Sequence, residues 1–291
     1  MKLRFDRILL LCLTAVMVLS GCGGKTKTPA EETVPETVET AAETVVETEP
    51  ETTPPEPDLL FEDTFDGTEL DSCKWERCPE WDRQGGLDVW DDDMAFLDGE
   101  GNLILRAEWN AEEGRIHSGA VRTYGKFTEA FAYYEASIRF TGTPGIWGAF
   151  WMMAGNVGGE DGSAADGVEI DIIESIGGQW GQSNSALHWD GYGAAHQSTS
   201  QTYENAGIYD GQFHTFGLWR TEDAYIFYID GKETWRVTGD QCAVCPEQGY
   251  MKLTVEGAEW AGAGTEESIG ALPADMVVDY VRVYREKPQG K

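Results

Sequence analysis

Residues 167–177 read GVEIDIIESIG, and this stretch says most about the fold. It is short, rich in β-branched apolar residues and bounded by glycine at each end, which predicts a β-strand. Because alternate residues of a strand share a face, Glu169 and Asp171 lie on one face and the apolar residues between them lie on the other. The strand therefore carries acids on one side and core residues on the opposite side.

Glu174 breaks this alternation. A regular strand would turn Glu174 into the core, and an unpaired buried charge is very costly. One extra residue at Ile172–Ile173, a β-bulge, removes the conflict and returns Glu174 to the acidic face, and bulges are frequent beside active sites. The sequence thus predicts a bulged strand with Glu169, Asp171 and Glu174 in a row on an open face.

The rest of the domain alternates short strands and turns, without a long amphipathic helix or an internal repeat. Strands at short spacing over about 230 residues predict an all-β fold, either a two-sheet sandwich or a barrel. Asp230-Gly231 suits the type I′ turn of a hairpin. The predicted strands cover residues 102–109, 118–124, 132–140, 276–284 and, as that hairpin, 225–237.

The row of carboxylates has a chemical consequence. Each ionised acid raises the pKa of its neighbours, and Asp171, in the middle, can hydrogen-bond either glutamate and keep their pKa values apart. Glycoside hydrolysis needs this arrangement, one carboxylate and one carboxylic acid beside the bond. A calcium site and a solvated strand edge are the alternatives. The flanking valine and isoleucines argue against a solvated edge, whereas acid clusters do bind calcium.

The segment EIDIIE resembles the catalytic signature of glycoside hydrolase family 16, in its bulged form Glu-x-Asp-x-x-Glu. The resemblance covers nearly all of residues 58–284, with FEDTFDG, DGEGNLILRAE and PGIWGAFWMM before the motif, as in laminarinase-like members, and MVVDYVRVY after it. It implies a concanavalin A-like jelly-roll β-sandwich with a concave substrate cleft, and endo-hydrolysis of a β-glycan with retention. Glu169 would be the nucleophile, Glu174 the acid/base and Asp171 the residue that assists the nucleophile.

Five further residues are predicted to bind substrate. Trp147 and Trp151 share a strand face, and an indole is a flat partner for the apolar face of a sugar. Core packing suits each tryptophan equally well, and the resemblance favours the cleft. His188 is expected near the acid/base, with a structural histidine as the alternative. Glu256, which binds a glucose hydroxyl or is a solvated acid, and Trp260 lie in TVEGAEWAGAG, whose departure from the family wording leaves the glycan open.

The resemblance also implies a structural calcium on the convex side. Asp279 matches the position that helps to bind it, and Glu62 and the carbonyl of Gly101 lie in segments that contribute nearby. An ordinary polar strand residue is the alternative for Asp279. No cofactor is expected to take part in catalysis.

The N-terminal region reads as an export and anchoring segment. Residues 1–21 form a basic stretch and an apolar run too short for an ordinary spanning helix, which predicts a signal peptide. Leu-Ser-Gly-Cys22 resembles a bacterial lipobox and predicts a lipidated Cys22, hence an extracytoplasmic, surface-exposed protein anchored to a bacterial membrane. Residues 22–57 contain nine glutamates, two lysines and no aromatic residue, which predicts a disordered tether. The catalytic domain is placed at residues 58–287, with a tail at 288–291.

Charge and cysteines restrict the partners. The net charge of −31 opposes binding to nucleic acid and other polyanions, and a monomer is expected. In an exported domain Cys73, Cys78, Cys242 and Cys245 favour disulfides, with three pairings open. A zinc site is disfavoured because the gap from Cys73 to Cys78 is loose for a zinc knuckle, and free thiols are the remaining alternative.

The function expected from these features is that of an endo-β-1,3-glucanase (laminarinase) or β-1,3-1,4-glucanase acting on a polysaccharide by double displacement. Sulfated galactans need cationic partners, and the domain is strongly acidic. The alternatives are a non-catalytic carbohydrate-binding lipoprotein, a galactan-specific, agarase-like enzyme and a transglycosylase that shares the covalent intermediate.

Overall fold

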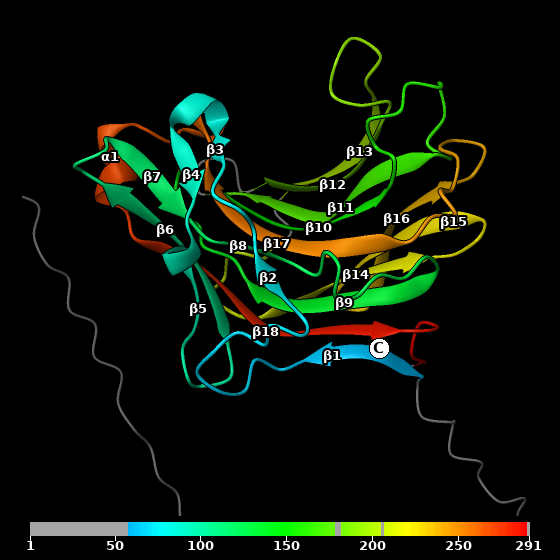
Figure 1. Cartoon of the computed structure of the whole chain (residues 1–291), viewed down its shortest axis with the longest axis horizontal. Helices are drawn as coiled ribbons and strands as arrows, with labels where there is room; N and C mark the ends of the chain where they lie inside the picture. The colour runs from blue at the N-terminus through cyan, green and yellow to red at the C-terminus, as the bar shows by residue number, and fades with distance from the viewer. Residues whose placement is uncertain (1–57, 178–181, 205–206, 290–291) are drawn as a thin grey trace, which may run out of the picture. The chain divides into compact units, whose positions relative to one another are not determined.

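The computed structural model describes residues 58–177, 182–204 and 207–289 (Figure 1). The predicted signal peptide, Cys22 and the predicted tether lie outside these residues. Within them, no helix is long and apolar enough to cross a membrane.

Two sheets build the domain. Across the larger sheet the strands are β16 (Lys232–Thr238), β15 (Ala224–Ile229), β14 (His214–Arg220), β9 (Ala132–Arg139), β18 (Ala274–Tyr284), β6 (Leu103–Asn110), β7 (Arg115–Ser118), β4 (Asp88–Trp90) and β3 (Asp82–Arg83), with β1 (Leu59–Asp63) on β18 and β5 (Ala95–Leu97) on β6. Across the smaller sheet they are β13 (Gln197–Glu204), β12 (Gln182–Trp189), β11 (Gly167–Ile176), β10 (Ile146–Gly155), β17 (Gly249–Gly257), β8 (Ala120–Arg122) and β2 (Glu76–Arg77).

Helices are few and short in the described residues. They comprise one α-helical turn, α1 (Glu266–Gly270), and the 3-10 turns η1 (Gln84–Gly86), η2 (Asp92–Met94) and η3 (Glu259–Ala261). In Figure 1 the two sheets lie one above the other, and β3 and β4 rise beside the smaller sheet. This arrangement is the predicted jelly-roll sandwich.

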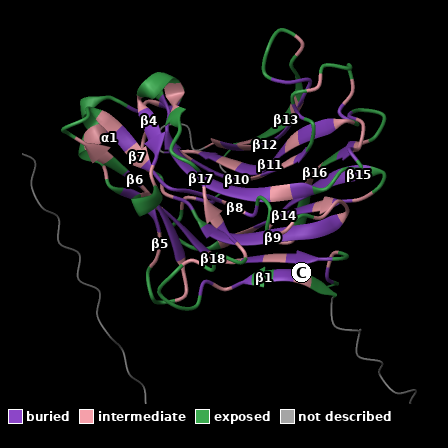
Figure 2. Ribbon diagram, in the orientation of Figure 1, coloured by how far each residue is buried: buried purple, intermediate pink, exposed green. Residues whose placement is uncertain are grey.

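The main core fills the space between the sheets. In β10 the side chains of Ile146, Phe150 and Met152 are buried in this core, and in β9 every second residue from Ala132 joins them. Fully burying an aliphatic or aromatic side chain contributes about 1.5–3 kcal/mol. Figure 2 shows the result, with buried residues along the strands of both sheets and exposed residues in the connecting loops.

A glycine brings the sheets together beside the cleft. A Cβ on Gly148 of β10 would lie 2.9 Å from Met276 Sδ and 3.0 Å from Phe140 Cδ1, closer than packed atoms tolerate. Only the absence of a side chain lets β10 approach the larger sheet here.

The predicted strands are confirmed, with one difference. The hairpin at 225–237 is β15 and β16, and Asp230 (φ +50°) and Gly231 (φ +71°) have the positive φ values of a type I′ turn. The single strand predicted at 118–124 is instead the end of β7 and all of β8. The chain changes sheets at Gly119, where a Cβ would lie 2.2 Å from the carbonyl oxygen of Met94.

Candidate active site

A cleft of about 870 Å³ lies on the face of the smaller sheet that is turned away from the core. Side chains of β10, β11, β12 and β17 form its floor, and β3, β4 and the β12–β13 loop supply further walls. All eight residues predicted for catalysis and substrate binding line it: Glu169, Asp171, Glu174, Trp147, Trp151, His188, Glu256 and Trp260.

The predicted bulge in β11 is confirmed. Asp171 pairs with Ala186 of β12 and Glu174 pairs with Asn184, so two residues of β11 stand opposite one of β12. The register against β10 shifts at the same point. Both bulge residues, Ile172 and Ile173, are in the core, and Glu174 returns to the cleft face. The cost of burying a charge is therefore avoided by one extra apolar residue.

Glu174 lies among neutral donors. Asn184 Nδ2 donates to Glu174 Oε2 at 2.5 Å. Burial raises the pKa of Glu174 to about 7, and Glu169 and Glu256 act in the same direction, whereas the Asn184 amide opposes the rise. A carboxyl group with a pKa near neutrality can hold a proton and release it, as a general acid must.

Glu169 has a different set of neighbours. The Tyr192 hydroxyl donates to Glu169 Oε2 at 2.5 Å. Burial raises the pKa of Glu169, but the Tyr192 hydrogen bond and the positive charges of Lys252 and Arg83 oppose the rise. These neighbours favour the ionised form, which is the form a nucleophile needs.

Asp171 differs from its prediction in one respect. It is 5% exposed, and burial together with both glutamates raises its pKa well above the usual range. Among the described residues no hydrogen bond joins Asp171 to either glutamate. Its neighbour is His188, whose Nε2 lies 3.4 Å from Asp171 Oδ2.

The prediction that His188 lies near the acid/base is wrong. His188 pairs with Glu169 across β11 and β12, at the opposite end of the acid row from Glu174, which Asn184 contacts instead. Burial and the nearby His196 lower the pKa of His188, so the imidazole is neutral near pH 7. Its Nδ1 lies 2.9 Å from His196 Nε2.

Glu256 is not a solvated acid. It is 2% exposed, and its Oε1 lies 3.0 Å from Arg83 Nη2. Gln84 Nε2 also donates to Glu256 Oε2, at 3.2 Å. Glu256 therefore holds the β3–η1 wall against β17 as well as lining the cleft.

The tryptophans differ in what covers them. Lys252 Nζ lies 3.6 Å from the centre of the Trp151 ring, and Trp151 Nε1 donates to Thr254 Oγ1 at 3.1 Å. Trp147 packs edge-to-face with Trp260 at 5.3 Å, and Trp260 is 53% exposed. Trp147 Nε1 is buried and makes no hydrogen bond of good geometry in the described part of the chain, yet it lies close enough to Glu174 to lower the pKa of that carboxyl. The pair of rings offers a sugar a flat aromatic surface.

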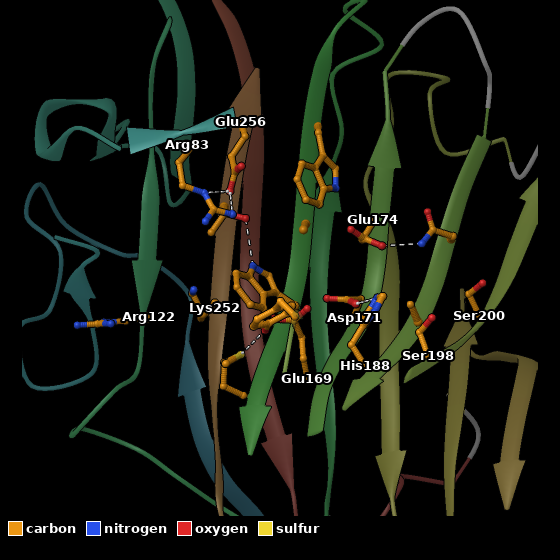
Figure 3. Close-up of a pocket in the computed structure, with 18 of the residues that line it drawn as sticks. Arg83, Arg122, Glu169, Asp171, Glu174, His188, Ser198, Ser200, Lys252 and Glu256 are labelled. Atoms are coloured by element: carbon orange, nitrogen blue, oxygen red, sulfur yellow. Dashed lines mark hydrogen bonds and ion pairs between the residues drawn. The ribbon is translucent and has the colours of Figure 1, made fainter. Parts of the chain in front are cut away.

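Several residues of the cleft were not predicted from the sequence, among them three that act on Glu169. Arg83, Tyr192 and Lys252 all line the cleft, from β3, the β12–β13 loop and β17. Figure 3 shows Arg83, Arg122 and Lys252 on one side of the acid row, and His188, Ser198 and Ser200 on the other. Because alternate residues of a strand share a face, Lys252 lies on the same face of β17 as Glu256. The position of Lys252 in the cleft could therefore have been predicted from the sequence.

Two groups of residues could be considered as metal ligands, one in the cleft and one on the convex side. Glu169, Asp171 and His188 offer ligand atoms within 4.8 Å of one another, but a set containing imidazole does not suit calcium, which takes about 6–8 oxygen ligands. On the convex side, Glu62 Oε1 accepts a hydrogen bond from Arg282 Nε at 2.8 Å, so the Arg282 guanidinium already binds that carboxylate. The structural calcium at Glu62, Gly101 and Asp279 stays a prediction.

The expected disulfides are absent from the described residues. Cys73, Cys78, Cys242 and Cys245 are free thiols, and all but Cys73 are buried. Burial raises the pKa of Cys78 to about 11, so this thiol stays protonated and unreactive.

Two unequally placed glutamates in the cleft of a jelly-roll sandwich define a glycoside hydrolase type of site. Comparison with known families agrees. Residues 60–286 match the family described as "Beta-porphyranase A-D, GH16 domain". The chain belongs to glycoside hydrolase family 16, as the EIDIIE resemblance implied.

Individual relatives carry names that describe different activities. The chain is 24% identical over 260 residues to glucan endo-1,3-beta-glucosidase A1 of Niallia circulans, covering 79% of this chain and 38% of that protein. It is 30% identical over 247 residues to keratan-sulfate endo-1,4-beta-galactosidase of Sphingobacterium multivorum, covering 78% and 55%. The chain thus spans less than two thirds of either relative.

A solved structure shows the same fold. The catalytic domain of an endo-1,3-beta-glucanase (laminarinase) from Thermotoga petrophila matches with a TM-score of 0.66 and 26% identity, covering 80% of this chain and 99% of that domain. The sandwich fold is therefore common to this chain and to a laminarinase domain.

Proposed function

We propose that the chain is a retaining endo-glycoside hydrolase that cleaves β-glucan, with β-1,3 linkages as the first substrate to test. The observation that carries this proposal is the unequal pair in the cleft. Glu169 receives a hydroxyl and nearby positive charge, whereas Glu174 receives an amide and has a pKa of about 7. Double displacement needs such a pair, one group ionised to attack and one protonated to release the leaving oxygen.

The charge of the cleft favours a neutral glycan. Arg83 is paired with Glu256, and Arg122 Nε lies 2.6 Å from Glu76 Oε1. Neither guanidinium is free to meet a sulfate, and the acid row adds negative charge. A β-glucan carries no charge and meets no such repulsion.

One observation favours a second candidate, a sulfated galactan. Lys252 points into the cleft between the rings of Trp90 and Trp151, and no carboxylate lies within ion-pair distance of it among the described residues. The family model is named for a porphyranase, and one relative is named a keratan-sulfate endo-1,4-beta-galactosidase. A local cation is the feature that an acidic domain would need for such a substrate.

The test is a substrate panel. The isolated domain, residues 58–287, is incubated with laminarin, lichenan, agarose, xyloglucan, porphyran and keratan sulfate, and product sizes are measured by chromatography, with Glu169→Gln as the inactive control. Oligosaccharides from laminarin or lichenan support the β-glucanase. Products from porphyran or keratan sulfate alone, lost in Lys252→Met, support the galactanase. Binding without cleavage of any polymer supports the carbohydrate-binding alternative.

We also propose a cellular location for the enzyme. Lipidation of Cys22 would hold the protein at a bacterial membrane surface, with residues 23–57 as the tether. Metabolic labelling with an alkyne fatty acid should mark the wild type, and the variant Cys22→Ser should lose the label. An unlabelled wild type would remove the lipoprotein from the proposal and leave the enzyme untouched.

A further inference from the structure

Tyr192 reaches from a loop onto Glu169. Its side chain is 64% exposed, yet its hydroxyl donates to Glu169 Oε2 at 2.5 Å. An exposed tyrosine could turn into solvent without cost, so a hydrogen bond to the half-buried Glu169 carboxylate indicates that the loop directs it there. Nothing in the family comparison or in the EIDIIE motif assigns this residue a role.

The loop before Tyr192 is built to hold it. Asp190 is 1% exposed, and its carboxylate accepts from Gly162 N at 3.0 Å and from Gln197 Nε2 at 2.5 Å. Gly191 N donates to the Val157 carbonyl at 2.7 Å. Both Asp190 and Gly191 have positive φ values, +59° and +69°. The buried Asp190 carboxylate, which accepts two hydrogen bonds, therefore fixes the turn that carries Tyr192.

A nucleophilic carboxylate has a geometric requirement. Only one of its two oxygens attacks, and that oxygen must face the anomeric carbon within a narrow range of directions. Glu169 is a flexible side chain beside two other acids, which repel it when they are ionised. A donor fixed on one oxygen would both select the orientation and stabilise the charge.

We propose that Tyr192 is a positioning residue, which binds Glu169 Oε2 so that Oε1 is the attacking oxygen. This inference rests on the proposed function. In the first step Glu169 Oε1 forms a bond to the anomeric carbon, the glycosidic C–O bond breaks, and its electron pair takes the proton of Glu174.

In the second step a water gives its proton to Glu174 while its oxygen attacks the same carbon, and the ester C–O bond breaks to restore the Glu169 carboxylate. Tyr192 keeps its proton throughout. Its hydrogen bond is strongest when Glu169 is a carboxylate, before the first step and after the second.

The environment of Glu169 holds other groups that affect its charge. Beyond Tyr192, the titratable and charged groups that act on Glu169 from its own and the neighbouring elements are Asp171, Glu174, His188, His196, Lys252, Arg83 and Tyr250. A change in pH behaviour must therefore be compared with a variant that leaves all of these in place.

Tyr192→Phe makes that comparison, because it removes one hydroxyl and keeps the ring. Loss of a hydrogen bond to a charged group predicts that kcat/KM on the active glycan falls roughly 10–100-fold. The fall should lie in kcat, and the acidic limb of the pH profile should move to higher pH. Tyr124→Phe is the matched control, because Tyr124 is an exposed tyrosine outside the cleft lining.

A second measurement isolates the first chemical step. A 2-fluoro glycoside with a good leaving group needs no proton from Glu174, and its trapping on Glu169 is followed by mass spectrometry. Labelling should slow in Tyr192→Phe by the same factor as kcat/KM. Unchanged kcat and labelling, or a fall confined to KM, would overturn the inference.

A third measurement separates failure of the inference from failure of the proposed function. If the wild type cleaves no glycan, the proposed function fails. The carboxyl ¹³C resonance of Glu169, assigned with Glu169→Gln, can still be titrated without substrate. It should titrate at higher pH in Tyr192→Phe than in the wild type and in Tyr124→Phe, and an identical midpoint would sink the inference.

Discussion

Glu169 and Glu174 carry the same side chain at the two ends of one strand, yet their surroundings differ in kind. Glu169 accepts from a tyrosine hydroxyl, and the positive charges of Lys252 and Arg83 act on it. At the Glu174 end the contact is the neutral amide of Asn184. Burial raises the pKa of both groups, so burial alone does not distinguish them. The difference arises from the residues that other strands and loops bring to each end.

The largest expected effect comes from removing each carboxylate in turn. Glu169→Gln should lower turnover of every substrate, on the order of 10⁴-fold, because the covalent step needs an anion. Glu174→Gln should be as damaging on polysaccharide but should spare the first step on an aryl glycoside whose leaving group needs no proton. Rates on both substrates, with azide added as an external nucleophile, measure the difference.

One control variant accompanies that experiment. Glu108→Gln, an exposed acid on β6 of the larger sheet, should leave both activities unchanged. Equal loss on the aryl glycoside in Glu169→Gln and Glu174→Gln would contradict the division of roles between the two ends of β11.

The second prediction concerns Arg83, one of the two cations whose charge acts on Glu169. Arg83→Met leaves the buried Glu256 carboxylate with Gln84 as its remaining side-chain partner, and breaking such a pair should cost about 3 kcal/mol of unfolding free energy. Urea unfolding measures this cost. Arg282→Met, which breaks the exposed pair with Glu62, should cost at most about 1 kcal/mol. Equal costs would show that the Arg83 wall is not held by its ion pair.

The third prediction tests the Glu174 end through pH. Asn184 donates to the carboxylate and so lowers the pKa of Glu174; without this donor the pKa rises above about 7. The general acid then keeps its proton to higher pH, so in Asn184→Ala the basic limb of kcat/KM should move upward. Gln201→Ala, an exposed side chain on β13, should leave the profile in place. A basic limb that stays or moves downward would contradict the role of Asn184.

Sequence alone predicted what local patterns encode. Alternation and the cost of burying Glu174 were enough to predict the strand, its acidic face and the bulge at Ile172–Ile173. The pairing of β11 with β12 is not contained in either strand, so His188 was assigned to the wrong glutamate. A strand pattern fixes which face a residue occupies, whereas only the register fixes its neighbour.

Contacts between residues far apart in the chain could not be predicted for a related reason. Arg83 and Glu256 are 173 residues apart in the chain. Neither the segment WDRQGG around Arg83 nor the segment TVEGAEW around Glu256 indicates that the two residues form a pair. Tyr192 lies in the loop between β12 and β13, and its bond to Glu169 depends on how Asp190 anchors the turn. The residues that separate the two glutamates were therefore the hardest to predict.

The smallest expected effect lies in sugar binding at the Glu174 end. Trp147 faces Ile176 across β10 and β11, near Glu174, and Trp260 leans against it with half of its surface exposed. Stacking of an aromatic ring contributes about 0.5–1.5 kcal/mol beyond area burial, so Trp260→Ala should raise KM several-fold with little change in kcat. Trp81→Ala removes an equally exposed indole that packs edge-to-face on Trp90, beside Arg83 and Lys252. A KM that rises only in Trp260→Ala would place the main sugar platform at the Glu174 end, and a rise only in Trp81→Ala would move it to the cation wall.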